Sequence, residues 1–173
     1  MEFNYRELLP EDFDRNSRVW IYQSNRMFTP HEAVQIEELL NSFIASWNSH
    51  GIPVRGFAKL FYNQFIILMA DEQASQVSGC STDSSVHLIR EIEKTYTVRL
   101  FDRQVLAFYE KDQVRLVPLA QLKSGVAGGT IQPETLYFNN TVLTKQALET
   151  SWIIPVKDSW LGKKISTVTE AAK

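Results

Sequence analysis

A run of six apolar residues, Phe65–Ala70, constrains the fold of this chain more than any other feature. A strand that is apolar on both sides has both faces buried, so it belongs in the middle of a sheet. The residues before it lead from Val54 into Tyr62-Asn63-Gln64, where Asn63 tolerates the left-handed backbone of a tight turn. The sequence therefore predicts a β-hairpin over residues 54–70 whose second strand is central.

Helical patterns lie on both sides of this hairpin. Thr29 can cap a helix, Pro30 fits the first helical position, and Glu32 completes a capping box. Gly51, with Pro53 beyond it, is expected to end this helix. Its apolar stripe recurs at helical spacing in Ala33, Ile36, Leu40, Phe43 and Trp47.

A polar loop from Asp71 to Ser85 leads into a second helix, which is expected from about Asp83 to Tyr96. Strands are predicted before the first helix, over Arg18–Gln23, and after the second, over Gln104–Glu110. The order strand, helix, strand, strand, helix, strand matches the ferredoxin-like (βαββαβ) plan, in which two helices pack on one face of a four-stranded antiparallel sheet. We therefore expect an α+β fold of this plan.

The chain is expected to divide into three parts: an N-terminal arm over residues 1–17, a ferredoxin-like core over 18–123 and a mixed α/β extension over 124–173. The turn Lys111-Asp112 is expected to lead into a further strand within the core. In the extension, Thr144 is a candidate helix cap, and the apolar run from Trp152 to Pro155 is a candidate strand.

Four aromatic residues of the two sheet-forming segments are candidate binding residues. We expect them on the face away from the helices, where an open apolar surface would be unstable in water. The extension, or a second subunit in a homodimer, would then cover this face. The four residues are Trp20, Tyr22, Phe57 and Phe61.

The stretch Arg55–Tyr62 also resembles the longer signature of the RNA-recognition motif, from which it departs at Lys59. Single-stranded RNA binding through stacked rings is therefore one alternative. Two observations argue against it. The signature follows the first helix, which makes its strand an edge strand, and a pI of about 5.9 removes the basic charge on which such binding depends.

Charge and cysteine usage narrow the classes of protein further. The net charge is −2, so neither nucleic acid nor a membrane surface is a favoured partner. The chain has one cysteine, which excludes an intramolecular disulfide and favours a reducing compartment. No signal-like segment and no apolar run of 18 residues occurs. We expect a soluble cytoplasmic protein, and the scattered histidines predict no metal or other cofactor.

Cys80 is the candidate nucleophile, because it precedes the second helix and helix N-termini stabilise thiolates. Asp83, three residues on, would oppose that anion. None of the histidines is tied to Cys80 by its spacing in the sequence. The segment is therefore better interpreted as a helix entry rich in capping residues, with an enzyme that uses Cys80 as the alternative.

Several phrases together resemble a family of small bacterial proteins, familiar mainly from the Bacteroidetes, that has no established activity. Some of its members carry a label as ABC-transporter ATPases, but this sequence has no Gly-x-x-x-x-Gly-Lys-Ser/Thr motif. The resemblance implies a bacterial cytoplasmic protein and no mechanism. The phrases are Val19–Arg26, Trp47–Gly51, Ser78–Ser85 and Asp158–Trp160.

Three functions follow as expectations from these patterns. The first is a non-enzymatic domain that binds a protein partner or a small ligand. The second is a small enzyme built on Cys80, and the third is a single-stranded RNA binder.

Overall fold

The computed structural model describes residues 4–73 and 77–171, and their contacts divide into two compact units. The first unit holds residues 4–101 and 141–149, and the second holds 102–140 and 150–171. The division therefore differs from the expected one, because the boundary after Lys123 would cut α3 (Leu122–Ala127), which lies within the second unit. The ends of the expected arm and extension, and the middle of the expected polar loop, include residues outside the described ranges.

The first unit is built on a three-stranded antiparallel sheet in the order β1-β5-β4. The central strand is buried at all seven positions. Tyr62 and Asn63 have φ of 52° and 49°, which closes the turn between the two later strands. The predicted hairpin and its central strand are confirmed. The strands are β1 (Arg18–Gln23), β4 (Arg55–Phe61) and β5 (Phe65–Asp71).

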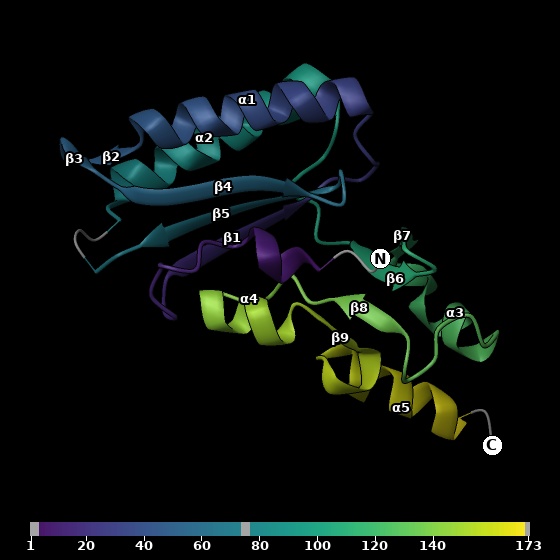
Figure 1. The fold of residues 1–173 in the computed structure, drawn as a ribbon. Helices are drawn as coiled ribbons and strands as arrows, with labels where there is room; N and C mark the ends of the chain where they lie inside the picture. Colours follow the sequence, from purple (N-terminus) through teal and green to yellow (C-terminus); the bar gives the residue numbers. More distant parts are fainter. Residues whose placement is uncertain (1–3, 74–76, 172–173) are drawn as a thin grey trace. The chain divides into compact units, whose positions relative to one another are not determined.

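Two long helices, α1 (Pro30–Ser46) and α2 (Gly79–Tyr96), lie on one face of this sheet (Figure 1). The capping box is confirmed, since the Thr29 hydroxyl accepts from the Glu32 amide at 3.3 Å and the Glu32 carboxylate accepts from the Thr29 amide at 2.8 Å. Pro30 occupies the first turn, where its missing N–H costs no helical hydrogen bond.

Both helices depart from their predicted ends by about a turn. Helix α1 stops at Ser46 with Trp47 as its C-cap, and Gly51, at φ 82°, lies instead in the turn between β2 (Asn48–Ser49) and β3 (Ile52–Pro53). Helix α2 begins four residues before Asp83 because the Ser78 side chain accepts a hydrogen bond from the Ser81 amide at 3.3 Å and caps it there.

The fold is mixed α+β with antiparallel sheets, but the ferredoxin-like plan is not confirmed. Three strands follow its order, whereas the expected fourth strand, β6 (Val105–Glu110), belongs to the sheet of the second unit. A local hairpin holds β6 there, because Lys111 and Asp112 have positive φ and form the tight turn to the next strand. Beside β1, the Val19 amide donates to the Leu143 carbonyl at 3.0 Å.

The expected placement of Trp20 and Tyr22 is wrong, because both side chains face the helices. The register explains this. Trp20 pairs with Leu68, and Leu68 pairs on its other side with Ala58, which faces the helices. Tyr22 lies two residues further along β1, so its side chain is on the same face. Phe57 and Phe61 point to the opposite face, so the four rings do not share one surface. The buried core beneath the helices comprises Tyr22, Phe28, Ile36, Leu40, Ala58, Leu60, Ile66, Leu68, Leu88, Ile89, Ile92, Val98 and Leu100.

The face opposite the helices is covered, but the expected extension supplies only part of the cover within the first unit, and the N-terminal arm supplies another part. Four side chains of this face have no exposed surface: Phe61, Phe65, Ile67 and Met69. The 3₁₀-helix η1 (Tyr5–Leu8) and the start of α4 (Lys145–Ser151) lie on this side of the sheet (Figure 1). The Tyr5 hydroxyl donates to the Leu148 carbonyl at 2.8 Å, which joins these two segments. Thr144 caps α4, as predicted, by accepting from the Ala147 amide at 3.2 Å.

The outer edge of β4 is bordered by α1. The Glu37 carboxylate accepts a hydrogen bond from the Leu60 backbone amide at 2.9 Å and lies 3.7 Å from the Lys59 ammonium. An edge-strand amide that would otherwise be open is thus paired with a helix side chain.

The second unit contains a four-stranded antiparallel sheet in the order β7-β6-β8-β9. The predicted strand after Trp152 is present as β9, and Trp152 itself is fully buried. Helix α5 (Leu161–Ala171) was not predicted. Its Gly162 sits against the Lys157 carbonyl, where a Cβ would collide. The other strands are β7 (Gln113–Pro118), β8 (Leu136–Phe138) and β9 (Ile153–Pro155).

Candidate functional site

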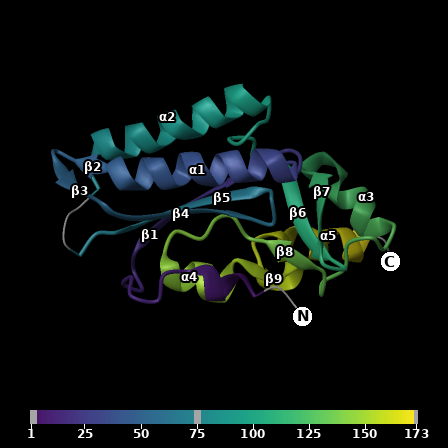
Figure 2. The ribbon, with the colours of Figure 1, turned by 45° about the horizontal axis from the view of Figure 1, so that its top comes forward.

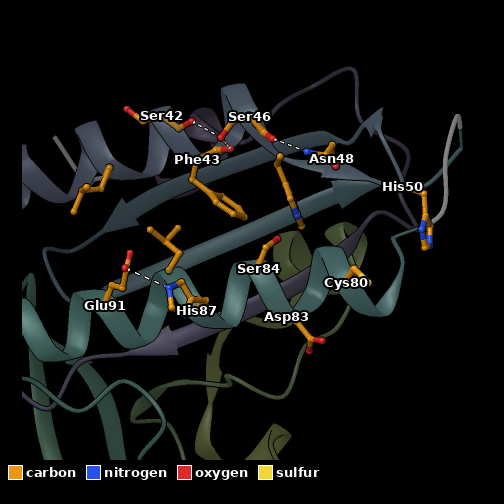
Figure 3. Close-up of a pocket in the computed structure, with 13 residues that line it drawn as sticks. Ser42, Phe43, Ser46, Asn48, His50, Cys80, Asp83, Ser84, His87 and Glu91 are labelled. Atoms are coloured by element: carbon orange, nitrogen blue, oxygen red, sulfur yellow. Dashed lines mark hydrogen bonds and ion pairs between the residues drawn. The ribbon is translucent and has the colours of Figure 1, made fainter.

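The first unit carries an open groove between α1 and α2 with a volume of about 780 Å³ (Figure 3). Helix α1 contributes four of the lining residues, Leu39, Ser42, Phe43 and Ser46. Helix α2 contributes Cys80, Asp83, Ser84, His87, Leu88 and Glu91. Trp47, Asn48 and His50 lie at the end where α1 runs into β2.

The lining residues of α2 follow helical spacing. Cys80, Ser84, His87 and Glu91 stand at i, i+4, i+7 and i+11, so they share one face of the helix. Residues 39 to 46 of α1 repeat in the same way on the opposite wall. Along α2 the groove extends over residues 80–91, and these 11 steps of 1.5 Å span about 16 Å.

Trp47 closes the groove at one end and joins the two helices. Its indole Nε1 donates to the Ser81 carbonyl at 2.9 Å, and the side chain is almost fully buried. The ring lies 6.2 Å from the ring of Trp20 and 5.2 Å from that of Phe43. Beneath it, a Cβ on Gly56 would approach the Trp47 ring to 2.6 Å, so only glycine leaves room for this packing.

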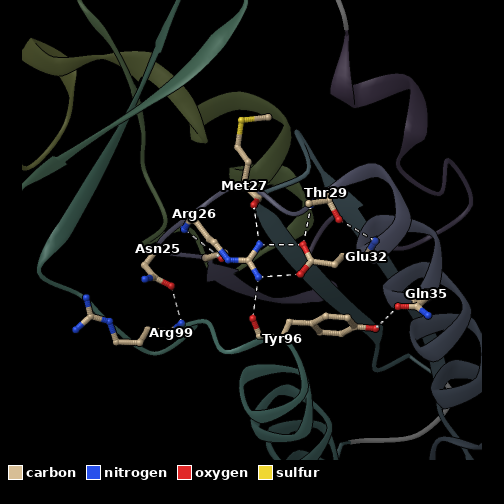
Figure 4. A network of polar contacts seen from close by, with 9 residues as sticks. Asn25, Arg26, Met27, Thr29, Glu32, Gln35, Tyr96 and Arg99 are labelled. Carbon is tan, nitrogen blue, oxygen red and sulfur yellow. Dashed lines mark hydrogen bonds and ion pairs between the residues drawn. The ribbon is translucent and has the colours of Figure 1, made fainter.

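A charged network joins the helices at the other end (Figure 4). The Arg26 guanidinium bonds both carboxylate oxygens of Glu32, at 2.8 and 2.9 Å, and also donates to the Tyr96 carbonyl at 2.7 Å. The Tyr96 hydroxyl and the Gln35 side-chain oxygen lie 3.4 Å apart. The hydrogen bonds from Arg26 and then from the Thr29 amide lower the pKa of Glu32 to about 2.

The two connections show that α1 and α2 run antiparallel. The end of α1 meets the start of α2 at Trp47, and the start of α1 meets the end of α2 at Tyr96. Figure 2 shows the two helices side by side on the sheet. The groove lies between residues 39–46 of α1 and residues 80–91 of α2, in the interval between the two connections.

Cys80 is exposed in the first turn of α2 and lines the groove. Asp83 is directed away from α1 in Figure 3. His87 lies seven residues along the helix from Cys80, which is about 10 Å and beyond hydrogen-bond reach. Its imidazole is instead 3.3 Å from the Glu91 carboxylate. The structure thus brings Cys80 and Asp83 to one groove but does not pair the thiol with a base.

The aromatic candidates do not form a binding surface. Tyr22 is 6% exposed and Phe61 is fully buried. Trp20 and Phe57 are half-buried, and they lie on opposite faces of the sheet. A base could not stack on rings placed in this way.

No metal centre is found in the described ranges 4–73 and 77–171, where three His, Cys, Asp or Glu side chains nowhere approach closely enough to hold an ion. A smaller cavity of about 330 Å³ lies beside β7 in the second unit. Its one cation, Arg115, is already bound by Glu110 at 2.7 and 2.9 Å and by the Thr130 carbonyl at 3.0 Å. The groove of the first unit is therefore the better candidate.

Comparisons of the chain with protein-family models, curated proteins and solved structures give no match. Within the described part of the chain, no helix has the length and apolar character needed to cross a membrane. The groove of the first unit is therefore the feature from which a function can be inferred.

The groove is not visible in the sequence, since its walls come from two helices separated by the whole hairpin. Leu39 was a weak signal, because it is a large apolar residue outside the predicted stripe of the first helix, as Val34 and Ile44 are too. Leu39 is 41% exposed in the structure.

Proposed function

We propose that this protein is a non-catalytic bacterial cytoplasmic protein that binds a segment of a partner protein in the groove between α1 and α2. The observation that carries the proposal is the pair of connections at the two ends of the groove. Trp47 and Ser81 hold one end, and Arg26, Glu32 and Tyr96 hold the other. A preformed groove binds at a lower entropic cost than one that must open.

The openness of the groove favours a protein segment over a small molecule. Small-molecule sites usually enclose 70–90% of their ligand, whereas this groove is open to solvent along its length. Its lining combines apolar surface from Leu39, Phe43 and Leu88 with serine side chains. A combination of apolar and polar side chains is usual in a protein interface.

The two other expected functions have less support. A cysteine nucleophile requires a neighbouring base, and Cys80 has no such partner in the groove. Nucleic-acid binding requires lysine and arginine, but neither occurs among the described residues that line the groove, whereas Asp83 and Glu91 do.

Selection of peptides against the full chain tests this proposal. A library of random 12-residue peptides displayed on phage is enriched on the wild-type protein, and the affinities of the selected peptides are measured for two variants. Leu39→Asn removes apolar surface from the groove. Val34→Asn is the matched control, since Val34 lies on the same helix, is 59% exposed and does not line the groove.

We expect the selected peptides to bind Leu39→Asn about tenfold more weakly and Val34→Asn as tightly as wild type, because burial of a leucine contributes roughly 1.5 kcal/mol or more. Bound peptide should also slow the alkylation of Cys80 by iodoacetamide. Equal binding to both variants, or the absence of enrichment, would contradict the proposal. Equal melting temperatures of the two variants exclude a general loss of structure.

A further inference from the structure

We infer that the segment bound in the groove is a basic amphipathic helix, an inference that rests on the partner-binding function proposed above. Both the backbone chemistry of the groove walls and the charge of the residues that line them point to this class of partner.

The walls of the groove are helices, whose backbone groups are already paired within each helix. They offer no free row of amides and carbonyls to which an extended peptide could add as a strand. An extended segment would therefore leave its own backbone groups unpaired where it is buried. A helical segment satisfies its own backbone and presents only side chains.

The dimensions and the pattern of the groove fit a helix of about three turns. The groove is about 16 Å long over residues 80–91 of α2, and a partner helix of 12 residues has the same length. Leu39 and Phe43 on α1 and Leu88 on α2 supply large apolar side chains to the lining. They match apolar side chains at i, i+3 or i+4, and i+7 on one face of the partner.

The charge of the groove selects a basic partner. Glu91 lines it, whereas Asp83, also a lining residue, is directed away from α1 (Figure 3). Among the described lining residues there is no lysine or arginine. The side chain of Glu91 is 65% exposed beside His87 and is open to a partner's cation. Arg90, on the same helix, stacks on the ring of Phe101 and is not part of the lining. Lysine or arginine on the flanks of the partner helix would complement the Glu91 carboxylate.

Three synthetic 14-residue peptides test the inference by fluorescence anisotropy against the full chain. The first has leucine at i, i+3, i+7 and i+10 and lysine on the flanks. The second replaces lysine with glutamate, and the third is a scrambled version of the first. Two charge-reversal variants of the protein accompany them: Glu91→Lys in the groove and, as the control, Glu7→Lys on the exposed η1.

We expect the patterned lysine peptide to bind at least tenfold more tightly than the glutamate and scrambled peptides. Its binding should weaken about fivefold for Glu91→Lys, chiefly through slower association, and should not change for Glu7→Lys. Leu39→Asn should weaken it about tenfold, as for the selected peptides.

The outcomes separate this inference from the proposed function. If the glutamate peptide binds the groove as tightly as the lysine peptide, the charge argument is wrong while the groove remains a binding site. Equal binding of the scrambled peptide overturns the helical argument. If neither patterned peptide binds but selected peptides depend on Leu39, the partner is not a basic helix. If no peptide depends on Leu39, both proposals fail.

Discussion

The two ends of the α1–α2 pair are held by different kinds of interaction, although each connection joins the same two helices. At one end a tryptophan is buried among other rings and makes one hydrogen bond, from Trp47 to Ser81. At the other end an arginine whose side chain is 40% exposed makes several charged hydrogen bonds, to Glu32 and Tyr96. The first connection should therefore depend on packing, and the second on pH and salt.

Removal of the tryptophan should have the largest effect. Trp47→Ala opens a cavity and leaves the Ser81 carbonyl without its donor, so it should lower the free energy of unfolding by about 3–5 kcal/mol. Chemical denaturation measures this. Trp47→Phe, which keeps a ring but loses the N–H, should cost clearly less. A Trp47→Ala variant as stable as one that lacks a single helix cap would show that the end is not held by packing.

Gly56→Ala tests the same end from the sheet side. Because the new Cβ would lie 2.6 Å from the Trp47 ring, the ring must move, and we expect a loss of about 1–3 kcal/mol. Gly79→Ala is the matched control, since a Cβ there meets nothing within 4 Å at the start of α2. That variant should be neutral or slightly more stable. Equal effects of the two substitutions on the unfolding free energy would contradict the packing argument.

The charged end contains the N-terminal cap of α1, and removal of this cap should lower the free energy of unfolding less than Trp47→Ala does. Thr29→Ala removes the hydroxyl that accepts from the Glu32 amide, which should cost about 1 kcal/mol. Thr29→Ser keeps an oxygen in place and should recover most of the loss. Thermal unfolding of the three proteins at neutral pH compares them. A loss as large as that of Trp47→Ala would reverse the proposed difference between the ends.

Acid should weaken the charged end selectively. The pKa of Glu32 falls from 4.5 to about 2 on folding, so its contribution to stability is complete above pH 4.5 and is lost as the pH falls toward 2. Arg26→Gln removes the main cause of this shift. The stability difference between wild type and Arg26→Gln, measured by denaturation between pH 6 and 2, should therefore shrink with falling pH. A difference that is constant across this range would exclude the ion pair as its source.

Local signals in the sequence predicted the elements of the first unit well. The apolar run Phe65–Ala70 predicted a central strand, and the capping residues Thr29–Glu32 predicted the start of α1. Both signals are local, because the residues that form them lie within a few positions of one another in the sequence. The face on which Trp20 lies could not be read from alternation alone. Alternation separates two sets of residues but does not say which set meets the helices, and the register with β5 decides that.

Features that depend on distant segments were not predictable in the same way. The turn at Lys111 and Asp112 was expected, but the sequence does not show that β6 pairs with the distant strand β8 instead of joining the first sheet. The groove arises from the separation of α1 and α2, which neither helix encodes alone. Its members on each helix recur at helical spacing, but the polar stripe from Cys80 to Glu91 is indistinguishable in sequence from an ordinary solvent face.

The contact between Glu37 and the edge of β4 has a consequence for the behaviour of the protein at high concentration. An open strand edge is a template on which further copies can add and grow into aggregates. Here the carboxylate occupies the Leu60 amide, and the Lys59 ammonium adds a charge to the same edge. An incoming strand would have to displace the carboxylate and bury both charges, so this edge is protected against polymerisation even though the strand is rich in aromatic residues.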